Sequence, residues 1–477
     1  MTHSQPRIAI IGAGPSGLYA AEGLRRHGWQ DVTVFERQAR VGGMALTRYY
    51  EPGDGRRIPY DMGSLQPSSS RQLVRLIEEL GLHFGVDLGE GHRVGQPIRL
   101  RLYNERQRKY VADFVSHPHT GQPWSKQLVF LRDIARLAPW VFRMRKLAKP
   151  GFSHGLPPKF LRMSVSEWMD ACDFKLIRPL LLAQASGVAC GGQHEHAASE
   201  RSMVQALKDL VFALKPPRVY GKGLYHPVRE GYQEVLIRLA KRLNVVTHAN
   251  ITAIRRDSAG VHLTCNGQSH HFDRLIIACP PNSLAPVMDA DAHERALYHM
   301  ARCNRPTWRV AFLARGIPEP AAGYLFTDQA EYADAPPSLS LFACNALVEG
   351  SGKDALRLYG GLVGHGSVEG IEVALDNAAN RLKNVFGAHD IQWIDKVFWP
   401  QFNTHIGIED VARGAYDQFE QLQGRNATYY TGEYLSGNSH GKTLEYSWEL
   451  VRRHFAKAPA PSATPAWQHG FGTRAGS

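Results

Sequence analysis

The chain has 477 residues, 43% of them hydrophobic and 21% charged, a balance that predicts a packed core and excludes a disordered or fibrous protein. No uninterrupted apolar run approaches the ~18 residues of a membrane-spanning helix, so an integral membrane protein is not expected. The net charge of +12 is diffuse and follows no nucleic-acid motif. We therefore expect a basic enzyme without a nucleic-acid partner, because net charge bears on association and not on fold.

The first residues read directly as a strand and not as a signal peptide, so we expect a cytoplasmic protein. The six cysteines form no CxxC pair and are typical of reduced thiols. The close histidines, His194-Glu195-His196 and His270-His271, lack further ligands at a suitable spacing. We therefore expect no metal site.

The clearest motif lies at the N-terminal end of the chain. The β-branched run 7–11 ends at a GxGxxG pattern formed by Gly12, Gly14 and Gly17, with Pro15 and Ser16 between the last two. An amphipathic helix over 18–27 and a strand over 31–35 follow, and Glu36 ends that strand. In such a unit the glycines allow a tight turn, close approach to a pyrophosphate and close helix packing. The helix N-terminus offers free N–H groups to the phosphates.

Glu36 lies 19 positions after Gly17, where a carboxylate accepts hydrogen bonds from ribose hydroxyls. The same negative charge disfavours a 2′-phosphate, so NADP is a poor ligand for this site. The motif strongly predicts a dinucleotide, but by itself it does not separate FAD from NAD.

The residues that follow Glu36 favour FAD over NAD. The stretch from Glu36 and Arg37 through Arg40 to Gly42 and Gly43 matches the ExxxxxGG extension of FAD-binding oxidases. The sequence Tyr60-Asp61-Met62-Gly63-Ser64 then follows in order. Paired glycines let the chain pass close to the diphosphate, where a side chain would collide. Arg40 would add a cation near the phosphates.

With these motifs the sequence resembles the flavin-containing amine oxidase superfamily, over about residues 6–455. The segment 244–254 resembles the return to the FAD domain, and the resemblance implies that the Ile251 backbone meets the adenine end. The stretch 428–433 resembles the YxAGE element of the family, and it leads to a helix that we expect to begin near Thr443. The N–H groups of such a helix start stabilise negative charge on the flavin pyrimidine.

Within the superfamily, the runs 397–402, 422–425 and 445–451 resemble a branch with a bacterial polyunsaturated fatty acid isomerase and fungal β-cyclopiazonate dehydrogenase. Three features depart from amine oxidases. Met44 replaces the arginine that usually follows the paired glycines, and the final helix reads Thr443-Leu444-Glu445-Tyr446 where an E-G-A run is usual. The stretch 306–312 offers no lysine near the flavin N5, which argues against an amine oxidase that uses oxygen.

The predicted cofactor is non-covalent FAD, because no histidine or cysteine stands at an evident attachment position. The predicted cofactor-binding residues come from five parts of the chain: Gly12, Gly14, Pro15, Ser16 and Gly17; Glu36, Arg37, Arg40, Gly42, Gly43 and Met44; Gly63 and Ser64; Ile251; Gly432, Glu433, Thr443 and Leu444.

The substrate side is less specific. Trp399 and Phe402 are the best candidates for a substrate-facing aromatic wall by their place in the branch motif, although buried aromatic residues more often belong to a core. The strand pattern 98–103 has one basic face. There Arg99 or Arg101 would hold a carboxylate head group, although a half-exposed strand with hydrated cations is the simpler interpretation.

The segment 129–149 combines aromatic and basic residues, and two interpretations fit this pattern. In the first, the segment contacts a membrane surface or forms a pocket entrance. In the second, it is a domain helix with a hydrated basic face and a kink at Pro139. The second interpretation is favoured because such patterns are common. A peripheral membrane contact therefore stays an open alternative, and the oligomeric state is not predicted.

We thus expect an α/β, amine-oxidase-like fold, in which an α+β substrate domain is inserted into a Rossmann-type FAD-binding domain. The predicted parts are FAD-binding at 1–65, 226–285 and 396–456, substrate domain at 66–225 (helical) and 286–395 (sheet), and a disordered tail at 457–477.

The predicted protein is an FAD-dependent oxidoreductase that abstracts hydride from a hydrophobic small molecule, with or without a carboxylate, so as to desaturate or oxidise a C–C or C–N bond. Two alternatives stay open: a redox-neutral double-bond isomerase of unsaturated fatty acids, and a flavoprotein without catalysis.

Overall fold

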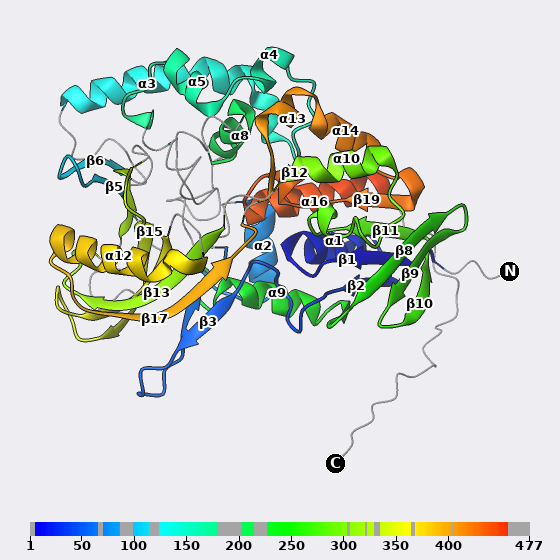
Figure 1. Ribbon diagram of the computed structural model, residues 1–477, viewed down its shortest axis with the longest axis horizontal. Coiled ribbons are helices and arrows are strands. Elements are labelled where there is room, and N and C mark those ends of the chain that lie inside the picture. The colour runs from blue at the N-terminus through cyan, green and yellow to red at the C-terminus, as the bar shows by residue number, and fades with distance from the viewer. Residues whose placement is uncertain are drawn as a thin grey trace.

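A computed structural model describes residues 5–64, 70–85, 99–114, 124–178, 181, 202–213, 227–302, 306–319, 322–328, 334–363, 368–402 and 404–456. The described elements form two adjoining regions, one around a parallel sheet and one around a larger mixed sheet, with a layer of helices along one edge (Figure 1). The predicted tail 457–477 and His194-Glu195-His196 lie outside the described residues.

The first region is built on a five-stranded parallel sheet whose strands come from three distant stretches of the chain. Its order is β19-β11-β1-β2-β7, with the bounds β19 Thr428–Tyr430, β11 Arg274–Ile277, β1 Ile8–Ile11, β2 Val32–Phe35 and β7 Asn244–Val246. The runs in β1 and β11 are almost wholly buried, as expected for strands covered on both faces. Helices α1 (Pro15–Arg26), α9 (Tyr232–Ala240) and α16 (His440–His454) pack beside this sheet.

A smaller antiparallel sheet and a group of short helices complete this region. The sheet has the order β10-β9-β8, with bounds Gln268–Phe272, Gly260–Cys265 and Ile251–Asp257. The helices are α10 (Ala292–Met300), α13 (Ile408–Ala412), α14 (Ala415–Leu422) and α15 (Glu433–Ser436). Two short strands, β12 (Ala301–Arg302) and β18 (His405–Ile406), pair antiparallel.

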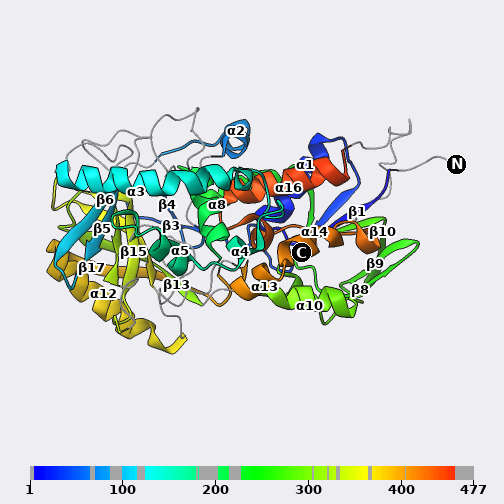
Figure 2. The same cartoon turned by 90° about the horizontal axis from the view of Figure 1, so that it is seen from above.

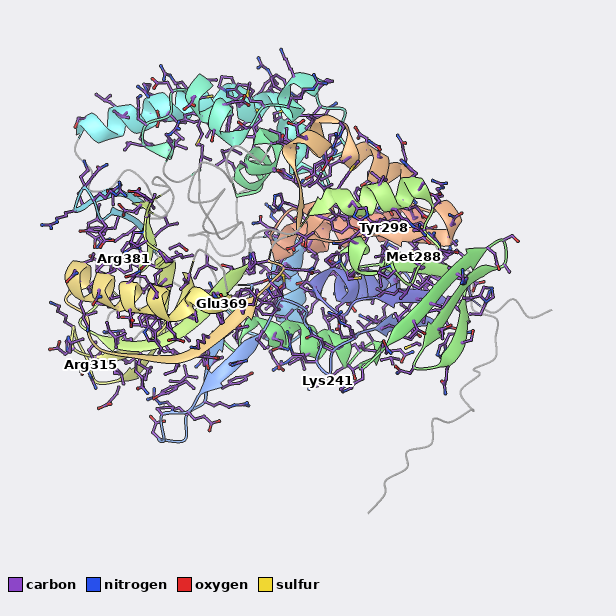
Figure 3. The ribbon with its side chains drawn as sticks, viewed as in Figure 1. Lys241, Met288, Tyr298, Arg315, Glu369 and Arg381 are labelled. Carbon is purple, nitrogen blue, oxygen red and sulfur yellow. The ribbon has the colours of Figure 1, made fainter. Side chains whose placement is uncertain are left out.

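A buried ion pair fastens β8 to α10. Arg256 donates to both carboxylate oxygens of Glu294 at 2.7 Å, and these side chains are only 2% and 1% exposed. On the same helix the Tyr298 hydroxyl lies 2.8 Å from that of Tyr430 and 3.6 Å from the sulfur of Met288 (Figure 3). These contacts connect the small sheet, α10 and the edge strand β19.

The second region is a seven-stranded mixed sheet in the order β17-β13-β16-β15-β14-β5-β6. The strand bounds are β17 His389–Trp399, β13 Thr307–Arg315, β16 Leu356–Val363, β15 Leu339–Glu349, β14 Ala322–Phe326, β5 Arg99–Asn104 and β6 Lys109–Phe114. The predicted division between residues 395 and 396 falls inside β17. That strand pairs antiparallel with β13 from Trp399, opposite Thr307, to His389, opposite Arg315.

One helix and one hairpin connect with this sheet. Helix α12 (Ile371–Phe386) packs on it through Ala378 and Leu382, and its Arg381 bonds to the carbonyl of Leu339 at 2.9 Å (Figure 3). The hairpin β3 (Thr47–Tyr50) and β4 (Ile58–Asp61) leaves the first region beside β17. Tyr60 and Arg48 of the hairpin both contact Asp395 of β17, so the two regions meet there through side-chain bonds.

The helical layer consists of α3 (Trp124–Arg143), a 3₁₀ turn at Arg145–Ala148, α4 (Pro158–Leu161), α5 (Val165–Ala171) and α8 (Met203–Ala213). Helix α2 (Arg71–Glu79) packs instead in the first region, beside α16 (Figure 1). Seen from above, α3 spans much of the length of the second region (Figure 2). Pro139 lies inside α3, and the helix continues through it to Arg143. Among the described helices, none is both long enough and apolar enough to cross a bilayer.

Candidate functional site

The N-terminus of α1 lies directly after β1, at the carboxyl edge of the parallel sheet. Gly12 has φ +106°, a conformation that favours glycine, and a Cβ on Gly17 would lie 1.9 Å from the carbonyl oxygen of Gly12. Only glycine at position 17 therefore lets α1 begin this close to the turn. Pro15 opens the helix, Ser16 is buried in its first turn, and no side chain caps the N-terminus. The helix begins three residues before the predicted 18, because proline suits the first helical position.

Glu36 directly follows β2, beside this helix start, and is only 9% exposed. Its two carboxylate oxygens accept one backbone bond each, from the N–H of Ala13 at 2.8 Å and from that of Gln38 at 2.9 Å. The carboxylate is thereby held against the glycine loop. Arg37, which was predicted to contact the cofactor, has an exposed side chain directly after Glu36.

The paired glycines form a second loop against the first. Gly43 has φ +54°, and a Cβ on it would lie 3.1 Å from the Cα of Gly14. Arg40 donates to the carbonyls of Gly43 at 2.8 Å and Ala45 at 3.2 Å, so it shapes this loop. Burial lowers the pKa of Arg40, while the charge of Glu36 acts to raise it.

Met44 continues this loop into contact with the stretch after β4. The N–H of Ser64 bonds to the Met44 carbonyl at 2.9 Å, and a Cβ on Gly63 would lie 1.7 Å from that same oxygen. The two backbones therefore touch, which requires glycine at position 63. The structure brings the predicted residues 12–17, 36, 40–44 and 63–64 into one continuous surface.

The two later stretches approach the same surface. Backbone bonds from Glu36 to Val246 and from Ala249 to Glu36, both 2.8 Å, hold the return segment beside β2, and Ile251 follows at the start of β8. At the C-terminal stretch, Gly432 precedes α15, whose first residue Glu433 accepts a bond from the N–H of Thr404 at 2.6 Å.

The expected helix start near Thr443 is wrong by three residues. Helix α16 begins at His440, because the hydroxyl of Ser439 caps it by accepting from the N–H of Lys442 at 3.2 Å. Thr443 and Leu444 are therefore buried within the first turns of the helix and not at its first residue.

These residues fit a dinucleotide such as FAD. Helix α1 has twelve residues and an N-terminus without a side-chain cap, which suits a phosphate. A Cβ built on Gly14 would meet only the Cα of Gly43 within 4 Å among the described residues, so these residues leave room for a ligand directly beside Gly14. Glu36 at the end of β2 would receive ribose hydroxyls through the remaining lone pairs of its oxygens.

Trp399 and Phe402 meet at the junction of the two regions. The indole N–H of Trp399 donates to the carbonyl of Met62 at 2.7 Å, next to Gly63. Both aromatic residues pack in a cluster together with Met44, and all other members of the cluster are leucines: Leu102, Leu325, Leu341 and Leu362. An apolar, aromatic layer thus joins the paired-glycine loop to strands β5, β14, β15 and β16.

Sequence reasoning missed a buried cluster behind these loops. The hydroxyls of Tyr19 in α1 and Tyr232 in α9 are hydrogen-bonded, and the ring of Tyr232 lies 3.9 Å from that of His440 in α16. Burial lowers the pKa of His440 to about 3, so this ring is neutral at physiological pH. The sequence gives no sign of this cluster, because Tyr19, Tyr232 and His440 are spread over 421 positions and form no motif.

Two buried ionisable residues were missed as well. Asp61 accepts from the hydroxyl of Thr47 at 2.6 Å and from the N–H of Tyr232 at 3.1 Å, and burial raises its pKa to about 6. The positive charge of Arg309 acts in the opposite direction. Arg309 is 1% exposed on β13, in the stretch where sequence reasoning searched for a lysine and found none.

The proposed carboxylate clamp receives no support from Arg101. Its guanidinium pairs with Glu319 at 2.9 Å and lies 5.0 Å from the ring centroid of Tyr110, so an acid of the protein already neutralises it. The side chain of Arg99 lies outside the described part of the chain. Within the described ranges, no group of three His, Cys, Asp or Glu side chains is placed to hold a metal ion.

The family model for flavin containing amine oxidoreductases matches residues 15–307, more than half of the chain. The chain belongs to this family. The membership confirms the predicted superfamily, the FAD cofactor and the class of FAD-dependent oxidoreductases. The match covers α1, the paired-glycine loop and the return strands, whereas Gly12, Gly14, Trp399 and the stretch 432–444 lie outside the matched residues.

Two curated relatives illustrate how far the sequence similarity extends. Tryptophan 2-monooxygenase of Pantoea agglomerans pv. gypsophilae is 40% identical over 78 residues, which are 16% of this chain and only 14% of that protein. The flavin-containing monooxygenase FMO GS-OX-like 5 of Arabidopsis thaliana is 24% identical over 321 residues, 59% of this chain and 67% of the relative. Similarity to the first relative is thus confined to a short segment.

Solved structures share the fold over almost the whole chain. The CLA-producing fatty acid isomerase from P. acnes superposes with a TM-score of 0.73 at 20% identity, covering 95% of this chain and all of the other. Putrescine oxidase bound to putrescine gives 0.67 at 16% identity, covering 95% and 98%. The α/β, amine-oxidase-like fold is therefore confirmed.

Proposed function

We propose that this protein uses FAD to abstract hydride from a carbon of a hydrophobic small molecule, which it desaturates or oxidises. The observation that carries the proposal is the layer formed by Met44, Trp399, Phe402 and four leucines beside the paired-glycine loop. Phe402 and the leucines are buried, and Met44 and Trp399 are half-buried at the side of that loop. Apolar and aromatic side chains of this kind are typical of sites for apolar ligands.

The protein's part in the reaction is to orient the substrate and to exclude water. Bound FAD supplies the chemistry by accepting the hydride. The indole of Trp399 is fixed by its bond to the Met62 carbonyl, so an aromatic wall would keep a constant position relative to Gly63 and the cofactor loop. Burial keeps His440 neutral, so it would add no charge near the start of α16.

The test is an anaerobic titration of the purified flavoprotein with panels of unsaturated fatty acids, other apolar alkenes and hydrophobic amines. Stoichiometric bleaching of the flavin by one substrate, with a product that has lost two hydrogens, is the expected result. The variant Trp399→Phe should bind FAD normally but reduce the rate of bleaching, because its ring is no longer fixed by the carbonyl of Met62. Val373→Gln, an exposed position on α12, is the matched control.

A second candidate is a redox-neutral isomerase of unsaturated lipids, in which hydride leaves one carbon and returns to another. Fold likeness to the P. acnes isomerase over 95% of the chain supports it, as does the apolar layer. Moved double bonds without net bleaching would favour this candidate over dehydrogenation. A flavin that photoreduces and reoxidises but is reduced by no substrate in the panels would instead favour a flavoprotein without catalysis.

A further inference from the structure

The outer face of α3 exposes apolar side chains to an unusual degree. Leu128 is 64% exposed, Leu131 54%, Ile134 39% and Phe142 69%. In the described part of the chain only two other large hydrophobic residues, Tyr110 and Val373, are exposed to this extent. Leu128, Leu131 and Phe142 lie on one side of the helix with Ala135 and Ala138, three and four residues apart, and we call this row with Ile134 the outer face.

The opposite face fixes the orientation of the helix. Asp133 is fully buried, and its carboxylate accepts from the backbone N–H groups of Lys175, Leu176 and Ile177 at 2.8–3.1 Å. Leu137 is also buried, and Trp140 makes edge contacts with Trp168 and Phe160. The helix therefore cannot turn its outer face inward without breaking these contacts, and the exposure is a property of the fold.

Positive charge surrounds this face. Between residues 124 and 162 the sequence contains nine Lys and Arg residues and a single acid, which is the buried Asp133. Arg143, Arg145, Lys146 and Lys149 are exposed at the C-terminal end of the helix, and the Arg145 guanidinium lies 4.7 Å from the ring centroid of Phe142. Arg132 and Arg136, on the flank of the helix, both lie near the exposed carboxylate of Asp173, at 3.7 and 2.8 Å, while the exposed acids Glu167 and Asp170 belong to α5.

We propose that the outer face of α3 docks on an anionic lipid surface, with its apolar row in the acyl boundary and its Arg and Lys residues at the head groups. An amphipathic helix with an apolar row and a basic flank has the composition of an interfacial helix. Long basic side chains keep their charge in the head-group layer while their stems cover apolar surface. A second copy of the chain fits less well, because two such faces would bring like charges together.

The position of α3 suits this role. The helix lies along the edge of the molecule, away from the parallel sheet and the hairpin β3–β4, so a bilayer would reach it without contacting either (Figures 1 and 2). Docking would place the molecule beside a source of apolar compounds. The inference does not depend on the proposed reaction, because lipid binding is measured without turnover.

Flotation of the full-length flavoprotein with vesicles tests the proposal. One set of vesicles contains phosphatidylcholine alone, and the other contains added phosphatidylglycerol. The protein should float with the anionic vesicles, bind the neutral ones more weakly and dissociate as salt rises. The double variant Leu131→Gln, Phe142→Gln should weaken binding by about tenfold or more, because both side chains would enter the acyl boundary.

Two further variants keep the test decisive. Val373→Gln removes an equally exposed apolar side chain from α12 and should leave vesicle binding within about twofold of the wild type. Arg145→Gln with Lys146→Gln should weaken binding to anionic vesicles by roughly fivefold per charge and leave the apolar row intact. Bound flavin and the unfolding temperature report whether each variant is folded.

The proposal is overturned if the wild type does not float with anionic vesicles, or if Val373→Gln loses as much binding as the double variant. It is also overturned if the wild type is a dimer that dissociates in the double variant and does not bind vesicles. In that case the outer face would be a contact between two copies of this chain.

Discussion

The close approach of the two glycine loops makes Gly43→Ala an informative perturbation. The new Cβ would lie 3.1 Å from the Cα of Gly14, against the 3.5–4.0 Å at which two carbons are usually in optimal contact. At φ +54° an L-residue also costs about 1–2 kcal/mol. The loop must therefore shift by several tenths of an ångström at the place where we expect the diphosphate to lie.

Gly55→Ala is the matched control. Gly55 has φ +85° in the β3–β4 hairpin, and no atom lies within 4 Å of its built Cβ. The control therefore bears a similar conformational cost without a close contact. We expect both variants to lose about 1–2 kcal/mol of unfolding free energy. Only Gly43→Ala should also bind FAD about tenfold or more weakly, because displacing the loop breaks the fit to the diphosphate.

The assay is titration of the apoprotein with FAD, followed by flavin fluorescence, together with urea unfolding in the absence and presence of FAD. FAD at a hundred times its Kd should raise the free energy of unfolding of the wild type by about 2.7 kcal/mol. At the same concentration the gain should be smaller for Gly43→Ala. An FAD affinity of Gly43→Ala within twofold of that of Gly55→Ala would refute the proposed position of the cofactor.

Three further predictions concern stability. Arg256→Met should lower the unfolding free energy by about 3–5 kcal/mol, because it leaves the 1%-exposed carboxylate of Glu294 without its main partner. A loss below about 1 kcal/mol, measured by urea unfolding, would contradict this prediction. His440 has a pKa of about 3 when folded and 6.5 as a free side chain, so its neutral form is favoured in the folded state. The free energy of unfolding should therefore fall as pH drops from 6.5 towards 3, by at most about 5 kcal/mol from this residue. His440→Gln should show a smaller dependence of this free energy on pH. An equal pH dependence in both proteins would disprove the assignment. Trp399→Phe should cost about 1–3 kcal/mol, because the Met62 carbonyl loses its donor, and thermal unfolding at matched FAD saturation measures the difference.

The nucleotide unit was predictable because its signals are local. The glycines, the helix and Glu36 occur within 30 residues and specify β1, α1 and β2 by spacing alone. The return strand β7 and the edge strand β19 were placed by family resemblance, since no property of residues 244–246 or 428–430 indicates which sheet they join.

Other features depend on contacts between distant residues. Arg101 reads as an available cation in sequence, but Glu319, 218 positions later, neutralises it across the edge of the large sheet. The burial of Arg309 could not be recognised from the sequence, because it depends on the strands that pack around β13, and that strand is almost wholly buried. The start of α16 was misplaced because Ser439 caps it, and sequence reasoning followed the family pattern at Thr443 in place of this local capping residue.

The identity and amount of bound flavin test the account most directly. The purified protein should be yellow, and acid or heat denaturation should release close to one FAD per chain into solution, with no flavin left on the polypeptide. A colourless protein that gains no flavin absorbance on incubation with FAD would contradict the assignment of the loops at Gly14 and Gly43 as a cofactor site.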